Sequence, residues 1–446
     1  MASGTRARSL VDRTLTVLTW GLAARRGVEL VEVLVSGRWS RRRLSGLATR
    51  PGKEPAVQLV CVVPMYLEQA IAAETVRFWH GFAERTGVAA VSFVTSVKER
   101  PEVGPTTRDI VAAELARLGN PDRLRLVHCE EVTRFRAAQL NLAVQQVRAN
   151  SMRTGHSPSS TWVAVYNADS RPSASTCAEL AGQSRAEPRI RVFQQLVDYV
   201  VPERPGAGLV AVGNSALQSW WTRSHYWTRN TVGRRDSWLA ATVPFSTFGH
   251  GEFVRLDFLE DIGGFPDFAY ADGLLLGWIC RLRGEPIGLL ASRDCAEVPR
   301  TGRDLVTQQA AWMRGLLNFD ATVAWCHQHG QVRLSRTQVA ALRAAHLSIP
   351  IIWGLSTAVL AAGTVLLGRR IIARSATVAD AAKLACLLSY PVVPTLALAG
   401  TGERPPGVLA RLAGAAASWP LEGVGFWPAV VSHLRRSQRA PTKTPR

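Results

Sequence analysis

The stretch that decides the fold reads Trp162-Val163-Ala164-Val165-Tyr166-Asn167-Ala168-Asp169-Ser170-Arg171-Pro172. Its apolar half has the length and composition of a strand, and Pro172 stops further pairing. Because side chains alternate faces along a strand, Asn167 and Asp169 should point the same way from its carboxyl end, where ligands bind in an open α/β sheet. A carboxylate beside an amide oxygen can hold a hard divalent cation that neutralises a diphosphate. The alternative for a strand-terminal Asp-Ser is a turn or a helix cap.

Strand patterns alternate with helix patterns on both sides of this stretch. The first strand, residues 58–64, is almost continuously apolar, as in a parallel strand that is covered on both faces. Repeated β-α units form a doubly wound, mostly parallel sheet with right-handed crossovers, so the predicted fold class is α/β. The sequence predicts strands at 58–64, 88–95, 124–128, 162–166 and 189–199, and helices at 68–86, 107–118 and 137–148.

Length, charge and cysteine usage limit the class of protein. The 446 residues exceed one ordinary domain, and the net charge of +19 comes almost entirely from Arg. That charge fits an Arg-biased proteome, or attraction to anionic lipid headgroups and nucleotide phosphates. Nucleic-acid binding ranks lower, because the Arg residues form no stripe interleaved with aromatic residues. The seven cysteines are scattered without a CxxC pair, which argues against disulfides or zinc and fits a reducing compartment.

Both ends of the chain carry features of membrane association. The N-terminus is basic around the uncharged residues 14–24, too short to span a bilayer, and predicts an amphipathic helix. That helix would lie on a membrane surface or on the protein's own C-terminal helices, and a cleaved signal peptide ranks second. Residues 347–368 have the length of a membrane span, with a buried core helix as the alternative. Residues 384–400 are a shorter candidate, and 412–434 are re-entrant or interfacial.

The composition therefore divides the chain into three parts. We expect a basic amphipathic N-terminal segment at 1–54, an α/β domain at 55–335, and a C-terminal membrane region with a basic tail at 336–446. Basic residues flank the predicted spans on both sides, so the positive-inside rule leaves the topology open.

Several motifs, read together with Asp169, resemble those of one enzyme family. The first strand ends in Pro64-Met65-Tyr66-Leu67-Glu68, Arg136 precedes Leu140-Asn141, and a glycine-rich segment runs from Gly249 to Pro266. Over roughly residues 55–330 the chain resembles a family 2 glycosyltransferase of the membrane-bound, polysaccharide-synthase-like type. The resemblance implies a GT-A nucleotide-binding domain, with C-terminal transmembrane helices where such enzymes often have them.

On the donor side, the resemblance implies that Pro64, Tyr66 and Glu68 contact the nucleotide. The alternative for Glu68 is an N-terminal helix acid stabilised by the helix dipole. Arg136 and Asn141 correspond to a basic segment beside a helix N-terminus, which suits a diphosphate, although Arg136 also reads as a solvated surface charge. Asn167-Ala168-Asp169 stands at the family's Asp-x-Asp, so Asp169 would bind Mg²⁺ or Mn²⁺ and the amide at Asn167 would lower metal affinity.

On the acceptor side, the resemblance points to Gly249-His250-Gly251-Glu252 and then Gly263-Gly264-Phe265-Pro266. Glycines let the backbone approach a sugar closely, so His250, Gly251 and Glu252 are candidate acceptor residues. The alternative is a pair of ordinary glycine turns.

The sequence leaves three alternatives for the general base. The family usually shows two adjacent acids before Leu-x-Leu-Gly, and here Asp272-Gly273 stands in their place. Either Asp272 takes the proton of the acceptor hydroxyl with a small register shift, or another acid such as Asp267 does, or the activity is weakened.

The family's Gln-x-x-Arg-Trp corresponds to Gln308-Gln309-Ala310-Ala311-Trp312, with Ala311 in place of the Arg and Arg314 one turn later. Gln308 and Trp312 share a helix face, so Gln308 would contact the diphosphate or the acceptor while Trp312 stacks on a sugar. The alternative for Trp312 is a core residue at a membrane boundary.

The predicted function is that of a membrane-associated, inverting, metal-dependent glycosyltransferase. It would move a hexosyl group from a nucleotide diphosphate sugar to a hydroxyl of a carbohydrate, lipid-linked or small-molecule acceptor, with Asp272, Gln308 and Trp312 as catalytic residues. We expect a multi-pass protein of the cell membrane with its catalytic domain on the cytoplasmic side, where nucleotide sugars are made. The alternative, suggested by the departures at Asn167, Gly273 and Ala311, is a catalytically degenerate relative that binds nucleotide sugars or partner proteins.

Overall fold

The computed structural model describes residues 2–48, 57–99, 104–131, 135–202, 208–233, 237–398 and 407–434. It contains one eight-stranded sheet with the strand order β3-β2-β1-β4-β7-β6-β8-β5. The strands are β1 (Gln58–Pro64), β2 (Ala90–Ser96), β3 (Leu124–Cys129), β4 (Thr161–Val165), β5 (Arg171–Pro172), β6 (Val192–Val200), β7 (Glu252–Arg255) and β8 (Ile287–Glu297).

The sheet is mostly parallel. Strands β3, β2, β1 and β4 run parallel in successive pairs, and β6 runs parallel to β8. Strand β7 is antiparallel to both of its neighbours, and β5 is antiparallel to β8. The predicted mixed α/β class is confirmed, but β5, β7 and β8 were not predicted, and β7 separates β6 from the four strands before it.

Helices cover both faces of the sheet, as a doubly wound fold requires. In β1, Val60 and Val62 face one buried cluster while Leu59, Cys61 and Val63 face the other. All seven residues of this strand are buried, which explains their continuous apolar character. The helices that contribute to these layers are α2 (Ala72–Thr86), α3 (Thr107–Arg117), α4 (Ala137–Thr154), α5 (Ser175–Ala186), α8 (Leu256–Ile262), α9 (Asp272–Arg283) and α11 (Phe319–Gln328).

Most predicted elements agree with the observed ones, with shifted ends. Helix α2 starts at Ala72 rather than at residue 68, so Glu68 lies in the turn before the helix, where its carbonyl oxygen accepts the N–H of Ala72. The alternative of a carboxylate in the first turn of that helix is therefore wrong for Glu68, because Glu74 holds that place. Helix α4 runs six residues beyond its predicted end, until Gly155 adopts a left-handed conformation and caps it.

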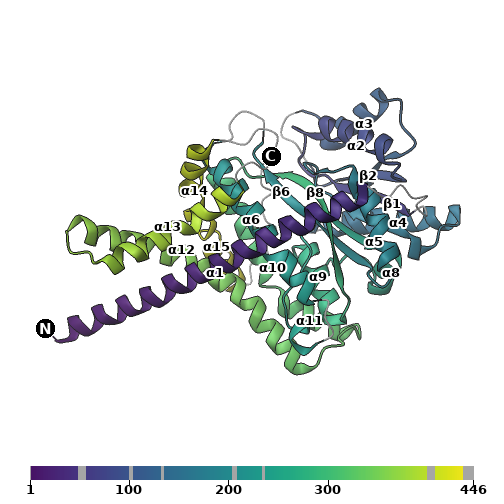
Figure 1. The fold of residues 1–446 in the computed structure, drawn as a ribbon. Helices are drawn as coiled ribbons and strands as arrows, with labels where there is room; N and C mark the ends of the chain where they lie inside the picture. Colours follow the sequence, from purple (N-terminus) through teal and green to yellow (C-terminus); the bar gives the residue numbers. More distant parts are fainter. Residues whose placement is uncertain are drawn as a thin grey trace.

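Five of the remaining helices, α1, α12, α13, α14 and α15, lie beside the sheet domain (Figure 1). We call these five the helical layer. In Figure 1, α12 and α13 extend away from the sheet on the same side as the N-terminal half of α1. The helical layer comprises α1 (Ala2–Ala48), α12 (Arg336–Ile372), α13 (Val378–Ala397), α14 (Val408–Glu422) and α15 (Phe426–Leu434). The other helices are α6 (Leu209–Gly233), α7 (Trp238–Ala241) and α10 (Gly302–Leu316).

Helix α1 packs on the protein's own C-terminal helices, which is one of the two placements expected for it: Leu15 shares a buried cluster with Leu360 of α12 and Leu387 of α13. It also contacts the sheet domain. The indole N–H of Trp220 in α6 donates to Glu29 Oε2 at 3.0 Å, and the hydroxyl of Ser40 donates to the carbonyl of Ala291 in β8 at 2.9 Å. Large apolar side chains on its other side are exposed, among them Val17 and Leu34. Helix α1 therefore bridges the sheet domain and the other helices of the helical layer.

In the described part of the chain, α12 is the one helix long and apolar enough to cross a membrane. Helix α13 covers most of the second predicted span, with Pro391 and Pro394 inside it. The third predicted segment is divided between α14 and α15, which have 15 and 9 residues and fall short of the roughly 20 that a span needs. The multi-pass arrangement therefore stays a prediction.

Candidate active site

A hollow of about 390 Å³ lies at the carboxyl edge of the sheet. Strands β4, β6 and β8 all end there, and β7, which runs in the opposite direction, begins there. The lining includes seven of the predicted site residues: Arg136, Asn167, Asp169, His250, Asp272, Gln308 and Trp312. Its volume lies within the range of small-molecule sites. We call it the first hollow.

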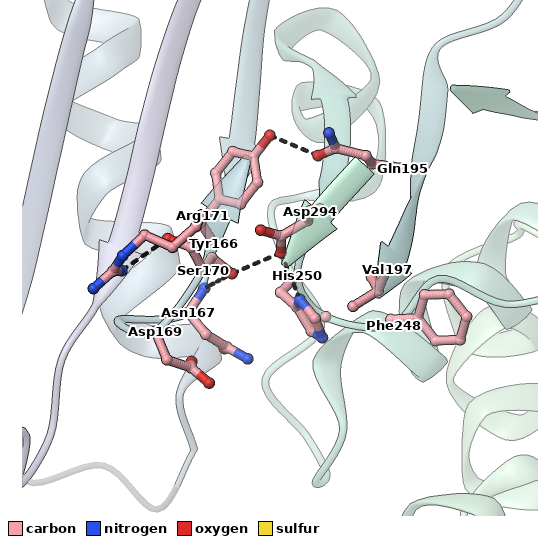
Figure 2. A network of polar contacts seen from close by, with 12 residues as sticks. Tyr166, Asn167, Asp169, Ser170, Arg171, Gln195, Val197, Phe248, His250 and Asp294 are labelled. Atoms are coloured by element: carbon pink, nitrogen blue, oxygen red, sulfur yellow. Dashed lines mark hydrogen bonds and ion pairs between the residues drawn. The ribbon is translucent and has the colours of Figure 1, made fainter. Parts of the chain in front are cut away.

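Asn167 and Asp169 lie in the turn after β4 and both line the first hollow. They extend from this turn away from Tyr166 (Figure 2). Asp169 is only 3% exposed, and its Oδ2 accepts the backbone N–H of Glu297, the last residue of β8, at 2.9 Å. The carboxylate is therefore held at the wall of the first hollow by the end of β8.

Arg136, at the start of α4, binds three parts of the site. Its guanidinium donates to Asn167 Oδ1 at 3.0 Å and to the carbonyl oxygen of Gly249 at 2.6 Å. It also makes two bonds to Asp272, to Oδ2 at 2.7 Å and to Oδ1 at 3.3 Å. Arg136 is thus a member of the site rather than a solvated surface charge.

Asp272 is the first residue of α9 and follows Ala271, whose φ of 68° lies in the left-handed region that non-glycine residues seldom adopt. Such backbone strain is common at functional sites. Asp272 lines the first hollow, whereas Asp267 is exposed and is not part of its lining. Of the two carboxylates weighed as general base, only Asp272 lines the first hollow.

The missing second acid has a steric explanation. A Cβ atom on Gly273 would lie 2.1 Å from the backbone N of Gly249 and 2.4 Å from its Cα. A carboxylate side chain therefore does not fit at residue 273 in this backbone arrangement.

A third acid, Glu252, lies behind this contact and is completely buried. A Cβ on Gly273 would be 3.0 Å from Glu252 Oε2, and Glu252 is not part of the lining of the first hollow. Burial away from water, followed by repulsion from the Asp272 carboxylate, raises the pKa of Glu252 to about 7. The structure therefore places Glu252 beside the candidate base, while the predicted contact with an acceptor stays a prediction.

His250 belongs to a polar network that the sequence did not reveal. Its Nδ1 lies 3.1 Å from Asp294 Oδ2, which also accepts the Ser170 hydroxyl at 2.7 Å. Figure 2 shows the Asp294 carboxylate between Ser170 and His250. Burial raises the pKa of Asp294, and the hydrogen bonds from His250 and Ser170 oppose that rise. The network links the turn after β4 to the loop before β7 through β8, a strand that the sequence did not predict.

Of the predicted donor-side residues, Arg136 and Asn167 line the first hollow and the other four do not. Pro64 is the last residue of β1, the strand beside β4, and Tyr66 and Glu68 follow it, but none of the three lines the first hollow. Asn141 does not line it either: its amide accepts the N–H of Phe265 at 2.7 Å and donates to the carbonyl of the same residue at 2.9 Å. Asn141 thus holds the glycine turn before Pro266.

Glu99, in the loop after β2, was not predicted as a functional residue, because it lies three residues beyond Ser96, the end of the strand. Glu99 Oε1 accepts the backbone N–H of Thr107 at 2.8 Å and the side-chain amide of Gln69 at 2.6 Å. Its Oε2 accepts the N–H of Leu67, which has a positive φ of 55°. Glu99 therefore fixes the loop that carries Tyr66 and Glu68.

Helix α10 supplies Gln308, Ala311 and Trp312 to the lining of the first hollow. Gln308 Oε1 accepts the side-chain amide of Gln218 in α6 at 2.8 Å. Arg314 is not part of this lining, so it does not replace the arginine that the family pattern has at residue 311.

The residues present fit a divalent cation only in part. No three His, Cys, Asp or Glu side chains in the described ranges gather into a group that could hold a metal by themselves. The side-chain oxygen of Asn167 accepts a hydrogen bond from Arg136. Within the motif, the Asp169 carboxylate is therefore the group left to bind a cation. Magnesium is commonly bound through one or two carboxylates together with substrate phosphates, and this donor set suits that arrangement.

No family model and no curated protein matches this sequence. Among solved structures, one similar to this chain is a mannosyltransferase, PcManGT from Pyrobaculum calidifontis, in complex with GDP-Man and Mn²⁺, at 16% identity and a TM-score of 0.48, covering 95% of this chain and 100% of that one. Residues 1–349 of S. aureus TarS match at 12% identity and a TM-score of 0.40, covering 86% and 93%. The same TarS segment with UDP-GlcNAc matches at 12% identity and a TM-score of 0.39, covering 85% and 92%. The function proposed below rests on the geometry of the first hollow.

Proposed function

We propose that this protein transfers a hexosyl group from a nucleotide diphosphate sugar to an acceptor hydroxyl. The observation that carries the proposal is the first hollow itself. It joins a cation, Arg136, and a strand-end carboxylate, Asp169, to an acid, Asp272, and an aromatic ring, Trp312. These are the groups needed to bind a diphosphate, take a proton and hold a sugar.

The diphosphate of the donor would lie against Arg136 and the N-terminus of α4. A guanidinium makes paired hydrogen bonds with phosphate, and the N–H groups at a helix start favour negative charge. The nucleoside would extend from there toward Tyr66 and Glu68, because β1 ends beside β4. Donor base and sugar are not specified by these contacts.

Asp169 would hold Mg²⁺ or Mn²⁺ jointly with phosphate oxygens. When bound, such a cation neutralises charge on the departing diphosphate. The protein's own contribution is to fix Asp169 through Glu297 and to keep Arg136 beside Asn167.

Asp272 would accept the proton of the attacking hydroxyl in a single displacement with inversion. Both of its oxygens bind Arg136 in the present arrangement. A donor diphosphate competes for that guanidinium, so donor binding would leave Asp272 available to the acceptor. Trp312 would stack on the acceptor sugar, and Gln308 and His250 would bind its hydroxyls.

The test is release of nucleoside diphosphate from UDP-, GDP- and other nucleotide sugars by the purified protein with Mn²⁺ or Mg²⁺. We expect turnover with at least one donor and loss of turnover in Asp169→Ala. Absence of turnover with every donor, or full activity in Asp169→Ala, would contradict the proposal.

Two observations favour a second candidate, a catalytically degenerate protein that binds nucleotide sugars or a partner. The ion pair with Arg136 engages Asp272, and the backbone contact at Gly273 excludes a second acid. This candidate predicts saturable binding of a nucleotide sugar without any release of nucleoside diphosphate. Isothermal calorimetry combined with the turnover assay separates the two.

We further propose that the helical layer attaches the protein to the cell membrane, with the catalytic domain facing the cytoplasm. The exposed apolar side chains of α1, α12 and α13 support this, as does the apolar length of α12. Extraction of cell membranes with alkaline carbonate tests it. Release of the protein into the soluble fraction would contradict a spanning helix.

A further inference from the structure

A second hollow, of about 80 Å³, adjoins the first. The two share five lining residues, Tyr199, Trp221, Trp312, Ile349 and Trp353. The second hollow lies between α6 and α10 on one side and α1, α12, α13 and α14 on the other. Its position therefore continues the candidate acceptor side, beyond Trp312, toward the helical layer.

Aromatic rings form much of the wall of the second hollow. Besides Trp312, they include Trp353, which stacks with Trp221 at a centroid distance of 6.5 Å, and Trp419 from α14. Tyr390 from α13 also lines the hollow, but the Arg26 guanidinium covers one face of its ring, 3.7 Å from the centroid. Aromatic faces pack well against the C–H faces of sugar rings because both are flat and apolar. This wall fits a sugar as well as it fits an apolar chain.

Two buried side-chain amides favour a sugar over an apolar chain as the occupant of the second hollow. Gln218 and Gln309 are 4% and 1% exposed and both line the second hollow, and the Oε1 atom of each has no hydrogen-bond partner in the described part of the chain. A buried acceptor without a donor is costly, and an alkyl chain would leave both unsatisfied. Sugar hydroxyls supply the O–H donors that these carbonyl oxygens require.

We propose that the second hollow is an acceptor subsite for a sugar ring next to the one that is glycosylated. The acceptor is then a saccharide or glycoside of at least two rings, with one ring at Trp312 in the first hollow and the next against Trp419 and Gln309. This inference rests on the proposed function, because it assigns the acceptor end of the same site.

The experiment uses the full-length protein in detergent and three series of probes. They are glucose, cellobiose and cellotriose; mannose, mannobiose and mannotriose; and N-acetylglucosamine with its β-1,4 dimer and trimer. Tryptophan fluorescence and calorimetry measure binding. In at least one series we expect the two-ring sugar to bind about tenfold more tightly than the monosaccharide.

The deciding variant is Gln309→Leu, and Gln331→Leu is its matched control. Gln331 also has a buried Oε1 without a partner in the described residues, but it lies outside both hollows. Gln309→Leu should reduce the gain from the second ring to about twofold, with a melting temperature at or above that of the wild type, because the unsatisfied oxygen is removed. Gln331→Leu should keep the full gain.

Failure of the subsite and failure of the transferase are distinguishable. Nucleoside diphosphate release without any gain from a second ring, or an equal loss of gain in both variants, overturns the subsite alone. Binding that follows alkyl chain length in octyl and dodecyl glucoside, not ring number, also overturns it. A gain that depends on Gln309 in a protein without turnover supports the subsite and overturns the transferase.

Discussion

The sheet domain and the helical layer place their apolar side chains in opposite ways. In β1 every residue is buried, and the sheet separates two apolar clusters. In the helical layer, by contrast, Ile351 and Leu355 on α12 are 50% and 54% exposed, and Val378 at the start of α13 is 89% exposed. Exposed apolar side chains of this size gathered over several helices are a feature of surfaces that contact a membrane or another protein. The two regions thus differ in how much apolar surface they bury, and the candidate site lies where they meet.

The largest expected effect on activity comes from replacing Asp169, the acid at the sheet edge that we assign to the cation. Asp169→Asn keeps an oxygen that can accept the N–H of Glu297 but removes the charge. We expect a loss of nucleoside diphosphate release of about 100-fold or more with little change in melting temperature. Asp169→Ala should lose as much activity and some stability. Retained activity in the Asn variant would show that the charge at Asp169 is not used.

Arg136→Lys comes next in size. Lysine keeps the positive charge but cannot bind Asn167, Gly249 and Asp272 at once, as the guanidinium does. We expect the donor KM to rise and kcat/KM to fall by roughly tenfold to 100-fold. A variant with an unchanged donor KM would place the role of Arg136 in folding rather than in donor binding.

Glu252 tests how strictly the sheet domain excludes water. Because its pKa is raised from 4.5 to about 7, the folded state binds a proton more tightly than the unfolded chain, so stability should fall as pH rises from about 4.5 to 7. Glu252→Gln should remove this dependence and gain roughly 3 kcal/mol above pH 7. Thermal unfolding between pH 4 and pH 8 measures the difference. Parallel curves for the two proteins would show that Glu252 is hydrated.

A pair of glycine substitutions compares the two regions directly. Gly273→Ala forces a Cβ against the backbone of Gly249 and should cost about 1–3 kcal/mol. A Cβ on Gly21 in the middle of α1 would meet no atom within 4 Å, so Gly21→Ala should stabilise by up to about 1 kcal/mol. Chemical unfolding checks both, and equal effects would contradict the tight contact at residue 273.

The smallest effect on folding is expected in the helical layer. Ile351→Ser together with Leu355→Ser changes exposed positions, so unfolding in detergent should shift by no more than about 0.5 kcal/mol per site. Flotation with liposomes should nevertheless recover less of the variant protein. Unchanged flotation would remove this face of α12 from the membrane contact.

Much of the sheet could be predicted from local pattern, and much of the site could not. The run at 58–64 coincides with β1 because seven consecutive buried residues leave few other interpretations. Strand β7 has only four residues and lies antiparallel between β4 and β6, an order that no periodicity reports. The carboxylates of Glu99 and Asp294 were missed for a related reason: each acts through partners on other elements.

The sequence by itself determined the alternation of strands and helices and the shared face of Gln308 and Trp312, whereas Asn167 and Asp169 lie in a turn beyond the end of β4. The alternation and the shared face follow from the periods of the strand and the helix, which are local properties of the backbone. Only the tertiary structure decided that Arg136 meets Asp272, 136 residues away, and that Gly249 leaves no room for a side chain at residue 273. Such contacts depend on how whole elements pack, and packing is settled by the shape of the entire core.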